Sequence, residues 1–250
     1  MLGRTHVALG LMTSLGIAVL LGNPFMVESF NTIALLVAVG GALLPDLDMG
    51  TSSLAGKFGL LKAKHIKKIW IAILTTLSIG TLFFLKDTPI FYGIALILFL
   101  GFIFAKQFAQ KGYYMMRNFV QSMTAITVMI GAYYYEHYPL IWIGVILMIL
   151  LLVKHRSFSH SILFLIGCTL VVRQISFFYG DIDYSLIFGV SMGSHLLGDM
   201  LTKAGIGLFI PITHKRIKFP FTIKTGGWVE NIVFMGAFLV IFQIIREIAF

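Results

Sequence analysis

The sequence predicts an all-α membrane protein, a polytopic transmembrane helical bundle with about seven to nine membrane segments. Hydrophobic residues make up 58% of the chain and charged residues only 12%, against roughly 25% charged residues in ordinary soluble domains. The mean hydropathy is +0.95. Because apolar stretches follow one another with short breaks, residues 1–250 are expected to form a single integral membrane domain.

Nine apolar segments follow one another along the chain. They span residues 7–22, 30–44, 69–85, 90–105, 119–135, 140–153, 161–179, 184–198 and 229–249. A perpendicular transmembrane helix needs about 20 apolar residues, and 30–44, 140–153 and 184–198 are shorter than this. These segments either extend into the interface through polar flanks or lie buried without crossing. The first segment is expected to be retained, because no clear small-x-small cleavage motif precedes Asn23.

The breaks between the segments differ in charge. Four basic breaks, at residues 57–68, 106–117, 154–156 and 203–224, together with Arg4 hold 16 of the 19 lysines and arginines. Threading nine spans places these breaks on one side of the membrane, which the positive-inside rule assigns to the cytoplasm. Orientation and attraction to anionic lipid thus account for the net charge of +9. We expect no nucleic-acid partner.

The first polar motif is Leu-Pro-Asp-Leu-Asp at residues 44–48. Pro45 disfavours helix at the residue before it, so the chain is expected to break as it leaves the second segment. Asp46 and Asp48 then stand two residues apart, a spacing that lets a loop direct both carboxylates at one cation. The alternative is an aspartate pair that forms a turn or caps a helix.

The second motif is His-Arg-Ser-Phe-Ser-His at residues 155–160. Five residues of separation put His155 and His160 about 140° apart on a helix, so they would not share a helical face. A loop that enters a helix near Ser159 would let both imidazoles face one pocket, with a serine as N-cap. Arg156 could then hold an anionic oxygen such as phosphate. The alternative is a pair of interfacial histidines that reach toward lipid headgroups.

The third motif pairs His195 with Asp199. A separation of four residues places both side chains on one helical face, within reach of one metal. Alternatively, Asp199 could orient His195 by accepting its second N–H, or the two could form a purely structural hydrogen bond.

Two further residues are weaker candidates. His6 stands alone at the start of the first segment, where a structural role is also open. Glu230 opens the last segment, where it could favour the helix dipole or act as a general base or ligand. All of these candidates fall at the expected cytoplasmic ends of their segments. Imidazole and carboxylate are ligands for zinc or manganese, and the predicted metal ligands are His6, Asp46, Asp48, His155, His160, His195 and Asp199.

The order of these motifs resembles the YdjM-like family of membrane-bound metal-dependent hydrolases, also described as LexA-binding, inner membrane-associated hydrolases. The matched positions are His6, 44–48, His155, Arg156, His160, Ser161, His195, Asp199, Gly205 and Pro211. One departure is Ser157, where the family pattern has glycine. The family is also distantly similar to zinc-dependent phospholipase C and P1 nuclease, which implies hydrolysis of a phosphoester.

The resemblance and the residues together predict a metal-dependent hydrolase at the cytoplasmic membrane face. Its cofactor would be one or two divalent ions, zinc or manganese, and its substrate a lipid or lipid phosphate. Asp48, Arg156 and Glu230 are the predicted catalytic residues. A metal-ion or proton transporter is the first alternative, because ionisable residues at membrane depth suit that role. A non-enzymatic scaffold stabilised by a closed metal site is the second.

Overall fold

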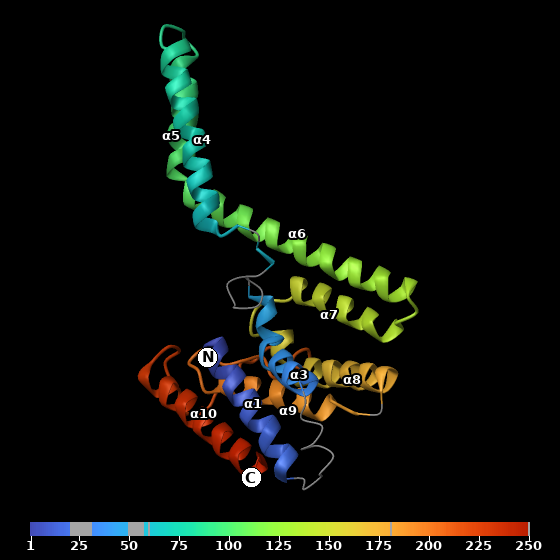
Figure 1. Cartoon of the computed structure of the whole chain (residues 1–250). Coiled ribbons are helices and arrows are strands. Elements are labelled where there is room, and N and C mark those ends of the chain that lie inside the picture. The colour runs from blue at the N-terminus through green and yellow to red at the C-terminus, as the bar shows by residue number, and fades with distance from the viewer. Residues whose placement is uncertain (21–31, 50–57, 60, 181, 250) are drawn as a thin grey trace. The chain divides into compact units, whose positions relative to one another are not determined.

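The computed structural model describes residues 1–20, 32–49, 58–59, 61–180 and 182–249 (Figure 1). Its helices are α1 (Gly3–Leu20), α3 (Thr32–Leu43), α4 (Ala63–Phe84), α5 (Phe91–Ile103), α6 (Ala105–Tyr134), α7 (Ile141–Leu152), α8 (Ile162–Tyr179), α9 (Ser185–Met200) and α10 (Trp228–Ala249). Three short 3-10 helices are η1 (Pro45–Asp48), η3 (Tyr138–Leu140) and η4 (Phe158–His160). The all-helical class predicted from the sequence is confirmed.

Each expected segment overlaps a helix, but the predicted break at residues 106–117 is wrong. Helix α6 runs through this basic stretch without interruption, because lysine, glutamine, methionine, alanine and arginine are all good helix formers. The chain bends instead by 65° between α5 and α6, at Phe104. Parts of four predictions lie outside the described residues, namely the segment ends at 21–22 and 30–31, the cleavage question at Asn23 and the basic residue Lys57.

Fewer helices are long enough to cross a membrane than the seven to nine segments predicted. Among the described residues, four candidate spans satisfy both length and hydropathy, and counting the bent pair α5–α6 as one span gives five. The four are α1, α4, α8 and residues 228–246 of α10. Helices α3 and α7 have 12 residues each. At 1.5 Å per residue they reach about 18 Å, well short of a hydrocarbon core of about 30 Å.

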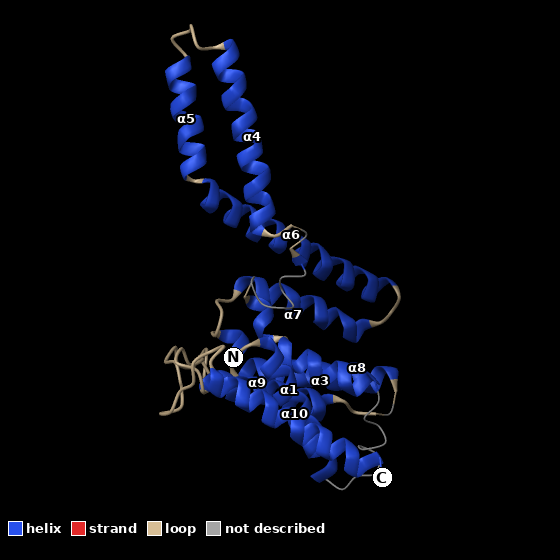
Figure 2. Cartoon of the chain, turned by 60° about the vertical axis from the view of Figure 1, so that its left-hand side comes forward, coloured by secondary structure: helices blue, strands red, loops and turns tan. Residues whose placement is uncertain are grey.

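The chain divides into two compact units, residues 1–55 with 122–250 and residues 56–121. In the first unit α9 is central, and α1, α3 and α8 all pack against it, while α10 packs against α1 (Figures 1 and 2). The connection from α9 to α10 is drawn as loop in Figure 2 and holds two isolated β-bridges. In the second unit α4 and α5 pair as a hairpin. The single-domain expectation stays a prediction.

Small side chains line the contact of α3 with α9. Ala38 and Ala42 are fully buried, and the Ser191 hydroxyl donates a hydrogen bond to the Ala38 carbonyl at 2.5 Å. A Cβ added at Gly41 would lie 2.7 Å from the Phe188 carbonyl oxygen. Small residues and interhelical hydroxyl bonds are the common means by which membrane helices approach closely. This seam therefore fixes α3 against the helix that carries His195 and Asp199.

Replacing Gly41 by alanine is expected to lower thermal stability in detergent, because the new methyl group meets the α9 backbone. Overpacking of this kind costs roughly 1–3 kcal/mol. Gly40→Ala is the matched control, since a Cβ at Gly40 meets nothing within 4 Å. A thermal unfolding assay should show a lower midpoint for Gly41→Ala only. Equal midpoints for the two variants would contradict the tight seam.

Candidate metal centre

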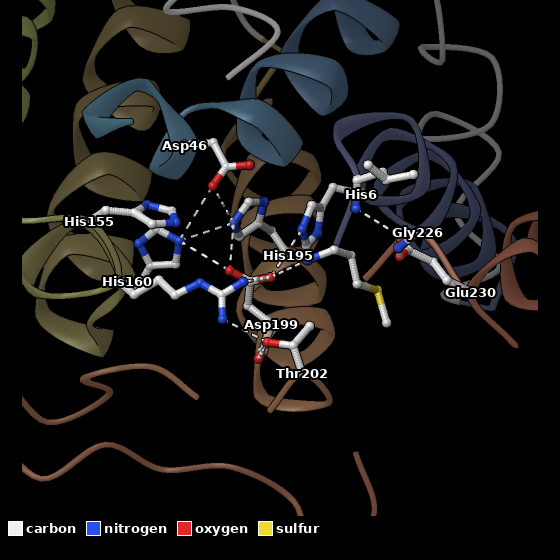
Figure 3. A network of polar contacts seen from close by, with 12 residues as sticks. His6, Asp46, His155, His160, His195, Asp199, Thr202, Gly226 and Glu230 are labelled. Carbon is white, nitrogen blue, oxygen red and sulfur yellow. Dashed lines mark hydrogen bonds and ion pairs between the residues drawn. The ribbon is translucent and has the colours of Figure 1, made fainter. Parts of the chain in front are cut away.

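The three sequence motifs meet at one end of the first unit. Pro45 stands at the first position of η1, so the chain leaves α3 and turns Asp46 and Asp48 inward. His160 closes η4, just before α8. His195 lies one turn before Asp199 near the end of α9, as the spacing predicted. Figure 3 shows Asp46 and His160 converging on the pair His195 and Asp199 of α9.

Four ligand atoms form a compact, buried group from Asp46, His160, His195 and Asp199, here called the four-residue group. The Nε2 atoms of His160 and His195 are 3.3 Å apart. Both Nε2 atoms lie 3.7 Å from Oδ1 of Asp46. The distance to Oδ2 of Asp199 is 3.4 Å from His160 Nε2 and 3.9 Å from His195 Nε2. Ligands at about 2.0–2.2 Å in a tetrahedron are separated by roughly 3.3–3.6 Å. The spacing of the group therefore fits a divalent ion.

A backbone carbonyl orients the first imidazole. Nδ1–H of His195 donates to the Ala42 carbonyl oxygen at 2.7 Å. Because a carbonyl only accepts, Nδ1 carries the proton and the lone pair of Nε2 faces the four-residue group. Histidine ligands in metal sites are commonly held in this way.

A serine links the second imidazole to the other aspartate. Ser159 is fully buried, and its hydroxyl donates to Oδ2 of Asp48. The same hydroxyl lies 3.0 Å from Nδ1 of His160, whose N–H it accepts. The sequence did not predict this role, since Ser159 was considered only as the place near which a loop enters a helix capped by a serine. The N-cap of α8 is Ser161, whose hydroxyl accepts the Phe164 N–H at 3.1 Å.

A second, overlapping group consists of Asp48, His155 and His160. Oδ1 of Asp48 lies 2.7 Å from Nδ1 of His155, and Oδ2 lies 3.7 Å from Nδ1 of His160. The His155 side chain is 29% exposed, whereas the four-residue group is buried. The second group is thus the more open side of the site.

The Asp199 carboxylate is surrounded by cationic and imidazole groups. Its Oδ1 lies 2.5 Å from the Met1 ammonium, 3.2 Å from Nη2 of Arg156 and 3.3 Å from Nε2 of His6. The His6 ring also stacks on His195, with centroids 3.8 Å apart. His6 therefore supports the four-residue group from behind. Its predicted role as a ligand stays a prediction, as do the other ligand assignments.

Arg156 is held by Asp199 near the end of α9 and by Thr202 just beyond that helix. Its Nη1 donates to Oγ1 of Thr202 at 2.7 Å, while Nη2 bonds Asp199. Thr202 was not singled out from the sequence, although it follows Asp199 by three residues on the same helix end. The Arg156 backbone has a φ of 61°, a conformation that non-glycine residues seldom adopt and that clusters at functional sites.

The serine in place of the family glycine leaves this loop formed. Ser157 has a negative φ of −109°, and its N–H and carbonyl bond Lys154 and His160 across two turns. Gly205, by contrast, has a φ of 62°, and a Cβ there would lie 2.6 Å from the Ile217 carbonyl oxygen. Glycine is thus required at position 205.

Glu230 lies apart from the converging side chains (Figure 3). Its two carboxylate oxygens accept the backbone N–H groups of Leu2 at 2.5 Å and Gly226 at 2.6 Å. It ties the start of α1 to the start of α10. The geometry favours this structural role over the predicted catalytic one.

The neighbouring charged groups shift the pKa values of Asp46 in η1 and His160 in η4. Burial raises the pKa of Asp46, but the neighbouring imidazoles of His160, His195 and His6 outweigh it and bring the pKa to about 2. Burial lowers the pKa of His160, but the neighbouring carboxylates of Asp199, Asp46 and Asp48 raise it to about 8. An ionised carboxylate thus faces a cation where a metal would bind, and metal must displace the His160 proton.

Fold and site together define a helical membrane protein with a buried His/Asp group compatible with a divalent metal. The profile of the YdjM inner membrane protein family matches residues 1–249. The chain belongs to that family, which confirms the resemblance seen in the motifs. No curated protein and no solved structure matches the chain. The distant similarity to phospholipase C and P1 nuclease stays a prediction.

Ser159→Ala is expected to weaken metal binding about 10–100-fold, the range for partners that orient a metal-bound histidine. Ser161→Ala is the matched control, because Ser161 caps α8 and touches no predicted ligand. It should lower stability by about 1 kcal/mol and leave metal affinity unchanged. Competition with a chelator of known affinity measures both variants, and Ser159→Thr should restore binding. Equal losses in both alanine variants would indicate a merely structural role.

Proposed function

We propose that this protein is a membrane-bound, metal-dependent phosphoester hydrolase whose site faces the cytoplasm. The observation that carries the proposal is the spacing of the four-residue group. Its two imidazole nitrogens lie 3.3–3.9 Å from each other and from both carboxylates, and all four ligand atoms lie within 4.8 Å of one another in a buried place. Two imidazoles and two carboxylates that converge on one point are a ligand set that suits a divalent ion. Membership of an inner membrane protein family supports a membrane setting for this chemistry.

The residues around the proposed ion would have separate roles in hydrolysis. Asp46, His160, His195 and Asp199 would hold a divalent ion, zinc or manganese. When bound, the ion would supply a water whose pKa is lowered to about 7 and a positive charge for a substrate oxygen. An ion that accepts more than four ligands retains a place for water.

Proton transfer is assigned to the open side of the site. Asp48 accepts the Nδ1–H of His155, which leaves the partly exposed imidazole ready to take a proton at Nε2. An imidazole oriented by a carboxylate is a common general base. Arg156 uses one N–H on Asp199 and one on Thr202, and guanidinium has five such donors. Its others are available to a substrate phosphate.

The cytoplasmic placement rests on the helix ends. His6 lies near the start of α1, Asp46 follows the end of α3, His160 precedes α8, and Asp199 lies near the end of α9. These ends meet at the site, and Lys154, Arg156 and Lys203 flank it in the sequence. A basic flank supports a cytoplasmic side. A lipid phosphate reaching the site from the bilayer is the substrate class that we propose.

Detergent-purified wild type is expected to contain stoichiometric zinc or manganese, and His160→Ala/His195→Ala is expected to contain none. His137→Ala is the control, because His137 contacts Phe178 and Tyr179 away from the site. Elemental mass spectrometry measures the content. Metal-free wild type after reconstitution with zinc and manganese would reject the proposal.

Hydrolysis is tested on the same preparations with a fluorogenic phospholipid. Wild type should hydrolyse this lipid, and the double variant should not. If the His155–Asp48 pair serves as the general base, Asp48→Asn should lower kcat more than 100-fold, because general-base catalysis usually contributes a factor of about 10²–10⁴. Full activity in Asp48→Asn would remove the pair from the mechanism.

A scaffold stabilised by metal is a second candidate, because four protein ligands are the number found in closed structural zinc sites. Loading the protein with cobalt(II) distinguishes an open catalytic site from a closed structural site. Inorganic phosphate should change the visible spectrum of an open site. An unchanged spectrum, together with a fall in melting temperature on metal removal, would favour the scaffold.

A further inference from the structure

A groove runs between α1 and α10 on the membrane-spanning part of the first unit. It has a volume of about 500 Å³, and its walls are apolar except at one end. Val7 and Leu11 line it from α1, and Phe234, Phe238 and Ile241 line it from α10. These positions are spaced by three or four residues, so each set lies on one helical face.

The polar end of the groove is formed by Arg4. Its Nη2 donates to Oδ1 of Asn231 at 2.8 Å, which places the starts of α1 and α10 together. From Arg4 to Leu11 the groove follows α1 for about 10 Å at 1.5 Å per residue. One end is therefore cationic, and the remaining length is apolar.

The charge of Arg4 is not neutralised within the described ranges. No carboxylate there lies within 4.0 Å of it, and its guanidinium rests over the Phe234 ring at 5.3 Å from the centroid. The neighbouring acid, Glu230, is turned to the N–H groups of Leu2 and Gly226. Arg4 is exposed, so an anion can reach it.

We propose that this groove binds one anionic phospholipid, with its phosphate on Arg4 and an acyl chain along Val7, Leu11 and the three α10 side chains. Charge complementarity selects the occupant, because a free positive charge at the end of an apolar groove matches an anionic headgroup followed by a hydrocarbon chain. Juxtamembrane arginines attract anionic lipid in this way. The site does not depend on hydrolysis, since binding alone satisfies both ends of the groove.

Native mass spectrometry of delipidated full-length protein tests the proposal with two lipids that share the same chains. Dioleoyl phosphatidylglycerol is expected to bind more tightly than dioleoyl phosphatidylcholine. Arg4→Gln should lower phosphatidylglycerol affinity roughly fivefold, the factor for one basic residue at an anionic surface, and Arg4→Lys should keep most of it. Equal affinity of wild type for the two lipids would overturn the proposal.

The matched control for charge is Arg173→Gln. Arg173 also rests over a phenylalanine ring, at 5.6 Å from the Phe177 centroid, but it pairs with Asp183 at 3.6 Å. Its loss should leave lipid preference unchanged, whereas an effect equal to that of Arg4→Gln would contradict a specific site.

The acyl chain is tested by filling the groove. Val7→Trp should reduce binding of both lipids, whereas Val19→Trp, on the same helix and outside the groove, should not. Inorganic phosphate as competitor should not displace phosphatidylglycerol. Displacement by phosphate, or equal effects of the two tryptophans, would reject a site that includes the chain.

Discussion

The buried Asp199 carboxylate is the constraint on which the rest of the site depends. The residue is 1% exposed, and a buried carboxylate is tolerated only where cations and hydrogen bonds compensate its charge. Compensation comes from Arg156, from imidazoles on α1 and η4, and from the amino terminus. Because these partners belong to separate parts of the sequence, satisfying one carboxylate draws α1 and η4 to the end of α9.

The contact that packs α3 on α9 also orients His195, because the two hydrogen bonds involved lie one helical turn apart. Ser191 bonds the Ala38 carbonyl, and His195 bonds the Ala42 carbonyl. Both steps are four residues, so the two helices keep one register along this seam. A shift of α3 would break the serine bond and also leave Nδ1 of His195 without its acceptor. Close packing of small residues thus determines which nitrogen of the His195 imidazole carries the proton.

Much of this arrangement could be predicted from the sequence. Hydropathy located each α-helix of the described residues, and motif spacing correctly placed His195 and Asp199 on one helical face. The loop expected between His155 and His160 does let both imidazoles approach Asp48. The number of spans was predicted too high, because every apolar segment was counted, including the short ones at 30–44 and 140–153 that form helices of 12 residues. The break expected at 106–117 failed because charge was read as a loop signal in a stretch of good helix formers. Ser159 and the Ala42 carbonyl escaped notice, since only tertiary contacts bring them to the imidazoles.

The wide spacing of the motifs also bears on how the protein is made. Asp46 leaves the ribosome roughly 150 residues before His195, a delay of roughly 7–30 s at synthesis rates of about 5–20 residues per second. During that interval neither α9 nor its imidazole exists to compensate the carboxylate. Pro45 ends α3 ahead of the two aspartates, which keeps them out of the apolar helix. The proline that shapes the finished site therefore also keeps an uncompensated charge off that helix in the nascent chain.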